Sequence, residues 1–147
     1  MRDFLLECYK VEKLAAKVYT KFAGNPSYPK AVCELFQKLA ADELEHSRVI
    51  DLVMQTPEQE LDATPALSTG EVDEMLELAN ALLAEAERGN LSANEALEFA
   101  LRIEHHLVQV HANNALEPKS ERLGKFFKEL AQYDRAHVDQ IQACINT

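Results

Sequence analysis

Acidic and histidine residues interrupt the apolar face of several segments that have helical periodicity. In residues 39–50, LAADELEHSRVI, Glu43 and His46 share one helical face with Leu39 before them and Ile50 after them. Other segments repeat this pattern, with apolar residues at the ends of the stripe and ionisable residues in its middle. The six mid-stripe residues are Glu12, Glu43, His46, Glu104, Asp134 and His137. A helix that buries this face must supply partners for buried charges.

These six side chains are candidate ligands of a pair of metal ions. A carboxylate in an apolar core costs several kcal/mol unless it is paired or binds a cation. One interruption in each of four helices brings four carboxylates and two imidazoles to one level of a bundle, and few lysine or arginine residues fall on the stripes. Oxygen and imidazole ligands without thiolate are typical of iron or manganese sites. Two alternatives remain open: carboxylates paired with buried bases, and coincidental acid–histidine pairs on the surface.

Helical elements should fill most of the chain. Only four glycines and five prolines occur among 147 residues, and apolar residues make up 47%, which favours a single all-α domain over residues 1–147. We expect helices over residues 3–23, 27–56, 68–88, 92–117 and 119–145. The sequences STGE from Ser68 and SANE from Ser92 are capping boxes that begin two of them. Pro29 should lie in the first turn of the helix that begins near Ser27.

The connections predict how these helices are arranged. The links GNPS and EPKS are short, so each joins two antiparallel neighbours. The segment between the two hairpins contains a helix of about 18 residues, roughly 27 Å long at 1.5 Å per residue. Its apolar face would lie against the outside of the bundle: Val72, Met75, Leu76, Ala79, Leu82, Leu83 and Ala86. We therefore predict a ferritin-like antiparallel four-helix bundle with a long, partly helical crossover between its second and third helices.

Charge and cysteine content narrow the class of protein. Residues 55–90 hold nine acids and one base, which gives −8 of the total net charge of −10. No basic stripe is present to hold phosphates, so we expect no nucleic-acid partner, and we interpret the acidic segment as a solvated face. The three cysteines form no CxxC pair, which argues against a rubredoxin-like or zinc-knuckle site and suits a reducing compartment.

The chain also lacks the features of a secreted or membrane protein. The start, MRDFLLECYKVEKLAAK, is too charged for a signal peptide, and no apolar run approaches the length of a membrane span. We expect a cytoplasmic protein without a membrane partner.

The sequence resembles the rubrerythrin group of the ferritin-like superfamily. The resemblance rests on EKLAAKVYTKFA, LAADELEHSRVI and LAQYDRAHVDQI, and it covers the four bundle helices. In ferritin-like two-metal bundles, two helices each give a Glu and two each give a Glu-x-x-His. The resemblance implies two iron ions, with manganese or a mixed pair as alternatives. It also implies reduction of peroxide or dioxygen, a separate electron-donor protein because a rubredoxin domain is missing, and a homodimer.

The resemblance also implies a role for each ligand. Glu12 and His46 would bind one ion and Glu104 and His137 the other, while two further carboxylates, from Glu43 and Asp134, would bridge the ions. This chain departs from the family pattern in two ways. Asp134 replaces the usual Glu and is shorter by one methylene, and Leu107 stands where rubrerythrins often carry an additional Glu. Binding of one ion only by Asp134 is the alternative to bridging.

Two other residues could contact the ligands without binding metal. His111 lies seven residues beyond Glu104, roughly 10 Å along the helix axis, which we take as too far for the same metal pair. We expect His111 to be a hydrogen-bonded core histidine or a hydrogen-bonding neighbour of the ligands. Tyr19, two turns from Glu12, is either a packing residue or a hydrogen-bond donor near the site.

Three functions therefore remain in view. The resemblance favours a two-iron oxidoreductase that reduces peroxide. The first alternative is an iron-binding, ferroxidase-type protein without peroxidase turnover. The second is a non-catalytic helical interaction module.

Overall fold

The computed structural model describes residues 1–57, 59, 69–116 and 121–146. Within these residues the chain forms five helices and no strand: α1 (Arg2–Ala23), α2 (Lys30–Met54), α3 (Thr69–Arg88), α4 (Ala93–Leu116) and α5 (Glu121–Ile145). The predicted all-α class is confirmed. Each helix contains 20 to 25 residues, so each runs most of the length of the molecule.

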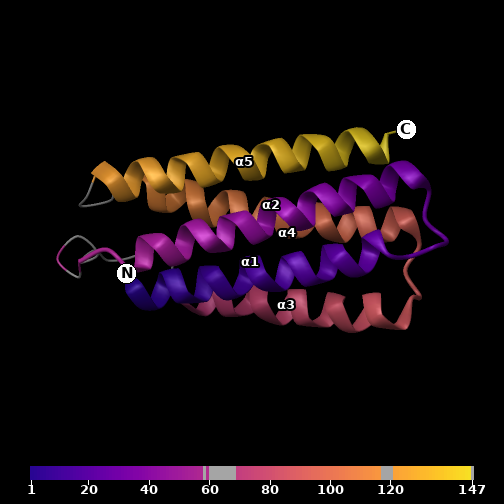
Figure 1. Cartoon of the computed structure of the whole chain (residues 1–147), viewed down its shortest axis with the longest axis horizontal. Coiled ribbons are helices and arrows are strands. Elements are labelled where there is room, and N and C mark those ends of the chain that lie inside the picture. The colour runs from indigo at the N-terminus through magenta and orange to yellow at the C-terminus, as the bar shows by residue number, and fades with distance from the viewer. Residues whose placement is uncertain (58, 60–68, 117–120, 147) are drawn as a thin grey trace.

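Four of the helices, α1, α2, α4 and α5, form the bundle (Figure 1). The helices α1 and α2 pack as one antiparallel hairpin, and α4 and α5 pack as the other. Between the hairpins, α3 runs back along the outside of α1, so that α4 starts at the same end of the bundle as α2. The predicted four-helix bundle with a partly helical crossover is therefore confirmed.

One apolar face holds the crossover helix α3 against the bundle. Val72, Met75, Ala79 and Leu82 are buried, and the other predicted members of this face pack partly buried against the core. The acidic side chains of Asp73, Glu74, Glu77 and Glu87 are exposed. The described part of the acidic segment therefore has the solvated face that we expected.

The start of α4 follows the predicted capping box. The backbone N–H of Ser92 donates to Glu95 Oε1 at 3.0 Å, and the N–H of Glu95 donates to Ser92 Oγ at 3.1 Å. These reciprocal bonds satisfy N–H groups that have no partner within the first turn of the helix. The STGE box includes Ser68, and the link EPKS covers residues 117–120, so both predictions lie outside the described residues.

The predicted start of the second helix is wrong by three residues. The helix α2 begins at Lys30, and Pro29 is its N-cap with φ −56° and ψ 148°. The backbone N–H and hydroxyl of Ser27 both donate to Asn25 Oδ1, at 2.9 and 2.7 Å, which holds Ser27 in the preceding turn. Tyr28 precedes a proline and is therefore disfavoured in the helical region. These two constraints delay the start of α2.

Aromatic clusters pack the core on both sides of its ionisable middle. Phe22 and Phe36 lie with ring centroids 5.0 Å apart, and Phe4 and Phe127 lie 6.4 Å apart. All four rings are buried. The ionisable residues of the bundle therefore lie in a polar layer with apolar walls.

None of the helices that the structure describes combines the length and the apolar character needed to cross a membrane.

Candidate metal centre

The structure brings all six predicted ligands together in the middle of the bundle. The carboxylate residues Glu12, Glu43, Glu104 and Asp134 have no exposed surface. The two predicted histidines are 5% and 1% exposed. Each bundle helix contributes at least one of the six, because each mid-stripe position points into the same layer. The arrangement excludes the alternative of coincidental surface pairs.

The first group of donor atoms comes from α1 and α2. His46 Nδ1 lies 3.4 Å from Glu43 Oε2 and 3.8 Å from Glu12 Oε2. One nitrogen and two carboxylate oxygens of these residues lie within 4.8 Å of one another. In octahedral coordination, two ligand atoms that each lie about 2.1 Å from the ion are about 3.0 Å apart in adjacent positions and about 4.2 Å apart in opposite positions. The group therefore has the spacing of an ion's ligands.

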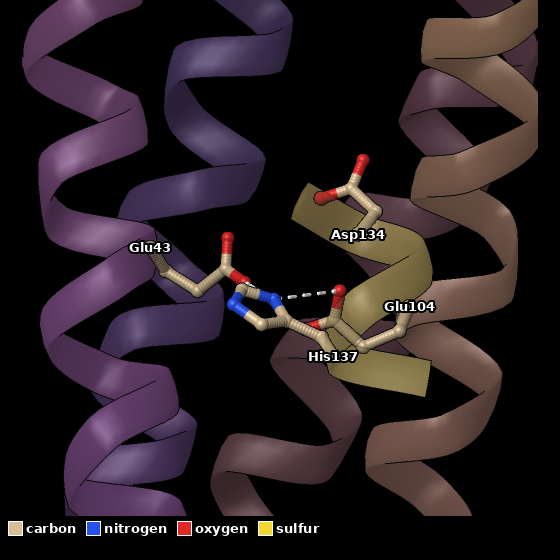
Figure 2. Close-up of side chains that lie close together, drawn as sticks. All are labelled: Glu43, Glu104, Asp134 and His137. Atoms are coloured by element: carbon tan, nitrogen blue, oxygen red, sulfur yellow. Dashed lines mark hydrogen bonds and ion pairs between the residues drawn. The ribbon is translucent and has the colours of Figure 1, made fainter. Parts of the chain in front are cut away.

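The second group combines α2, α4 and α5 (Figure 2). His137 Nδ1 lies 3.0 Å from Glu43 Oε1 and 3.4 Å from Glu104 Oε2. Of these two contacts, the one with Glu104 has hydrogen-bond geometry, and the closer approach to Glu43 is an electrostatic contact. Asp134 completes the group. Glu43 thus belongs to both of these groups, and Glu12 and Asp134 also share a third group with His111.

His111 is a buried histidine that bonds a predicted ligand, as we expected, and it lies closer to the other predicted ligands than its distance from Glu104 suggested. Its Nδ1 lies 2.5 Å from Asp134 Oδ2, and its Nε2 lies 3.8 Å from Glu12 Oε1. The helices α1 and α4 are antiparallel (Figure 1), so moving seven residues along α4 from Glu104 leads to the level of Glu12. Distance from Glu104 alone was therefore the wrong criterion. Tyr19 lies level with Glu104, and Glu12, seven residues before Tyr19 on α1, lies level with His111.

Tyr19 lies at the level of Glu104 and supports it. The Tyr19 hydroxyl donates to Glu104 Oε1 at 2.9 Å, and the tyrosine ring is fully buried. Burial, followed by the nearby charge of Glu104, raises the pKa of Tyr19 well above its ordinary value. The phenol therefore keeps its proton and acts as a hydrogen-bond donor, which was one of the two roles considered from the sequence.

Asp42 is a functional residue that the sequence analysis missed. Its Oδ2 lies 3.0 Å from His137 Nε2, on the side of the ring that faces away from the cluster. The same oxygen accepts a bond from Lys38 at 2.8 Å. Burial of Asp42 opposes ionisation, but the bonds from Lys38 and His137 outweigh it and lower the pKa of Asp42. A carboxylate behind a histidine is the usual outer partner of a metal ligand and orients its ring.

The hydrogen bonds of this cluster are incomplete. Within the described part of the chain, seven buried side-chain atoms lack a hydrogen-bond partner, and all seven belong to the cluster: both oxygens of Glu12 and of Glu43, His46 Nδ1, His111 Nε2 and Asp134 Oδ1. Buried polar groups in native proteins are almost always satisfied. No lysine or arginine is buried among the residues described, so a base cannot be the missing partner here. Four carboxylates match the charge of two divalent cations, and the donor set fits iron or manganese.

Without a cation, the cluster holds protons instead. Burial, with the charge of Glu43 next in importance, raises the pKa of Glu12 and of Glu104 well above the ordinary value. Burial alone would raise the pKa of Glu43, but its contacts with Glu12 and the histidines lower it well below the ordinary value. Burial alone would lower the pKa of His137, but Glu104 and Glu43 raise it to about 11. A metal ion must therefore displace protons from its ligands.

A surface hollow reaches the outer side of the cluster. It has a volume of about 400 Å³ and is lined by His46, Asp42 and Tyr133 among others. The rings of His46 and Tyr133 lie 5.4 Å apart, while His46 Nδ1 faces the buried carboxylates. One imidazole ring thus lies between the hollow and the metal-ligand layer.

Two departures from the resemblance are visible in the structure. Leu107 is buried with 1% exposure, so an apolar side chain fills the position of the additional glutamate. Asp134 uses Oδ2 for His111 and leaves Oδ1 without a partner.

Other residues that could bind metal lie outside the cluster or stay protonated. His105 and His106 are exposed and lie outside the cluster. Cys8 is a buried thiol, and burial raises its pKa to about 12, which keeps it protonated.

A family model described as Rubrerythrin matches residues 3–145. Neither the curated proteins nor the solved structures contain a significant match to the chain.

Proposed function

Since the chain belongs to the rubrerythrin family, we propose that it binds two iron ions in the bundle core and reduces hydrogen peroxide with electrons from a separate donor protein. One observation supports the proposal most strongly. The seven unpartnered polar atoms in the described chain all lie on the buried acidic and histidine side chains of one layer. Such a layer has the donor atoms and the negative charge that a pair of iron ions requires.

The ligands divide between two ion positions. Glu12 and His46 would hold one ion, and Glu104 and His137 would hold the other. Glu43 belongs to both donor groups and would lie between the ions. A reduced iron pair supplies the two electrons that convert hydrogen peroxide, with two protons, into two molecules of water.

The remaining residues of the layer position the ligands and control access. Tyr19 orients Glu104 through a hydrogen bond of 2.9 Å. Asp42 binds the outer nitrogen of His137 and leaves Nδ1 directed at Glu43 and Glu104. The apolar walls keep bulk water away from the layer, and the hollow beside His46 gives a small molecule such as peroxide an approach from the surface. These features suit a small oxidant better than a large substrate.

Single-turnover oxidation tests the proposed activity. The protein is loaded with ferrous ion without oxygen and mixed with hydrogen peroxide, and the rate is compared with that of free ferrous ion. We expect much faster oxidation in the protein, and the same rate in a Glu34→Ala variant, because Glu34 pairs with Lys30 on the exposed face of α2 and lies outside both the ligand layer and the hollow. A rate no higher than that of free ferrous ion would refute the peroxidase proposal. Fast reaction with dioxygen in the same protein would then support the ferroxidase alternative.

A further inference from the structure

We propose that His111 is a third nitrogen ligand of this centre and binds, through Nε2, the ion on the Glu12 side. The inference rests on the proposed two-metal centre and adds a ligand to it. His111 was not among the six ligands predicted from the sequence, and its position in the cluster comes from the packing of α4 against α1 and α5.

The hydrogen bond to Asp134 fixes which nitrogen of His111 is free. Asp134 Oδ2 lies 2.5 Å from Nδ1, so the Asp134 carboxylate occupies this nitrogen, and Nε2 is the ring nitrogen that has no hydrogen-bond partner. This is the arrangement in which histidine binds metals, with a carboxylate behind the opposite nitrogen.

The free nitrogen is directed at a predicted ligand. His111 Nε2 lies 3.8 Å from Glu12 Oε1, which is too long for a hydrogen bond. The same distance separates His46 Nδ1 from Glu12 Oε2. Both values fall between the separations of about 3.0 and about 4.2 Å expected for two ligands of one ion. Glu12 therefore lies between two imidazoles, with one oxygen toward each.

The surroundings hold the His111 ring in this position. The residue has no exposed surface, and its ring stacks on Phe127 with centroids 6.2 Å apart and an interplanar angle of 28°. Nε2 has no hydrogen-bond partner. A buried ring nitrogen without a partner, 3.8 Å from an unpartnered carboxylate oxygen of Glu12, is unfavourable unless a cation or a proton lies between them. A metal ion removes this cost and leaves Asp134 Oδ1 as the oxygen that faces the metals.

The consequence is an unequal pair of metal positions. The Glu12 side has two imidazole ligands, His46 and His111, and the Glu104 side has one, His137. Asp134 binds metal through one oxygen, because the other holds His111.

Scalar coupling across the metal–nitrogen bond tests this inference. The whole chain is loaded with a spin-active cadmium isotope after incorporation of histidine labelled with spin-active nitrogen, and coupling to each ring nitrogen is recorded by NMR. Coupling requires a direct bond, so a histidine that merely positions Asp134 shows none. We expect three coupled histidines in the wild-type protein, including His111 through Nε2, and two in His111→Gln. The matched control His105→Gln, an exposed position on the same helix, should keep all three.

The outcomes separate this inference from the proposed function. Coupling to His46 and His137 alone, in wild-type protein with two bound ions, would refute the role of His111 and leave the two-metal centre intact. Cadmium uptake without any coupled histidine, or no uptake at all, would refute both. As a second readout, His111→Gln should weaken binding of one of the two ions by at least about tenfold, the lower bound for loss of a partner in a metal site, while His105→Gln should not.

Discussion

Metal binding to this centre should release protons, so the affinity should rise with pH. The contacts of His137 with Glu104 and Glu43 raise its pKa to about 11, and the proton is held where an ion would bind. Glu12 and Glu104 also retain protons more strongly than ordinary glutamates, because burial raises the pKa of each. An ion binds the deprotonated forms of all three. Higher pH therefore removes the competing protons and strengthens metal binding.

The size of the effect follows from the number of protons displaced. Removing a proton at pH 7 from a group with a pKa of about 11 costs about 5 kcal/mol, at 1.36 kcal/mol for each pH unit. His137 alone gives a tenfold rise in the association constant per pH unit, and each glutamic acid that still carries its proton at that pH adds up to another factor of ten. We therefore expect a slope between about one and about three in the logarithm of the association constant against pH.

Calorimetry with manganese(II) measures both quantities. Titrations from about pH 6 to about pH 8 give the slope, and titrations at one pH in two buffers with different heats of ionisation give the protons released per ion. His106→Gln, at an exposed position on α4, should behave like the wild-type protein. An association constant that does not change with pH, with no protons released, would show that the protonated groups assigned here are not the ligands.

Three further predictions concern the supporting residues. Asp42→Asn should weaken metal binding about 10- to 100-fold, because it alters the outer partner of His137; competition with a chromophoric chelator measures this, and an unchanged affinity would remove Asp42 from the site. Tyr19→Phe should lower the free energy of unfolding of the metal-free protein by about 1 to 3 kcal/mol, since a buried oxygen of Glu104 loses its donor; equal urea midpoints for variant and wild type would contradict this. Ser92→Ala should lower the free energy of unfolding by about 1 kcal/mol through loss of the helix cap, and it should leave metal content unchanged; a loss of metal would mean that the cap affects the core.

The helical stripes predicted most of the fold and of the site. A carboxylate such as Glu43 between Leu39 and Ile50 has its burial dictated by its apolar neighbours on the same helical face. That signal is local, so it can be read in one helix at a time. The same holds for the capping box at Ser92, whose two partners are three residues apart.

Contacts between helices could not be read in this way. His111 was judged by its distance from Glu104 along one helix, but its partners Glu12 and Asp134 are on two other helices. The level at which antiparallel helices meet depends on how they pack, which the spacing within a helix does not fix. The signal available was a shared spacing. Glu12 and Tyr19 are seven residues apart, and so are Glu104 and His111, so antiparallel packing can pair Glu12 with His111 and Tyr19 with Glu104.

Asp42 escaped prediction for a different reason. It lies beside Glu43 but off the apolar stripe, with its side chain 34% exposed, and such a residue is usually a solvated acid. Only the need of His137 for an acceptor on its outer nitrogen points to it.

Metal content is the most direct test of the two-metal centre. The wild-type chain, Glu43→Ala and Glu45→Ala are purified without chelators, and bound metals are determined by elemental analysis. Glu43 lies in both donor groups, whereas Glu45 is two residues away and pairs with Arg48 on the surface. We predict two iron or manganese ions per chain in the wild-type protein and in Glu45→Ala, and loss of both ions in Glu43→Ala. Wild-type protein that is metal-free and takes up no ferrous ion would contradict the account, and the buried acids and histidines would then satisfy one another by sharing protons.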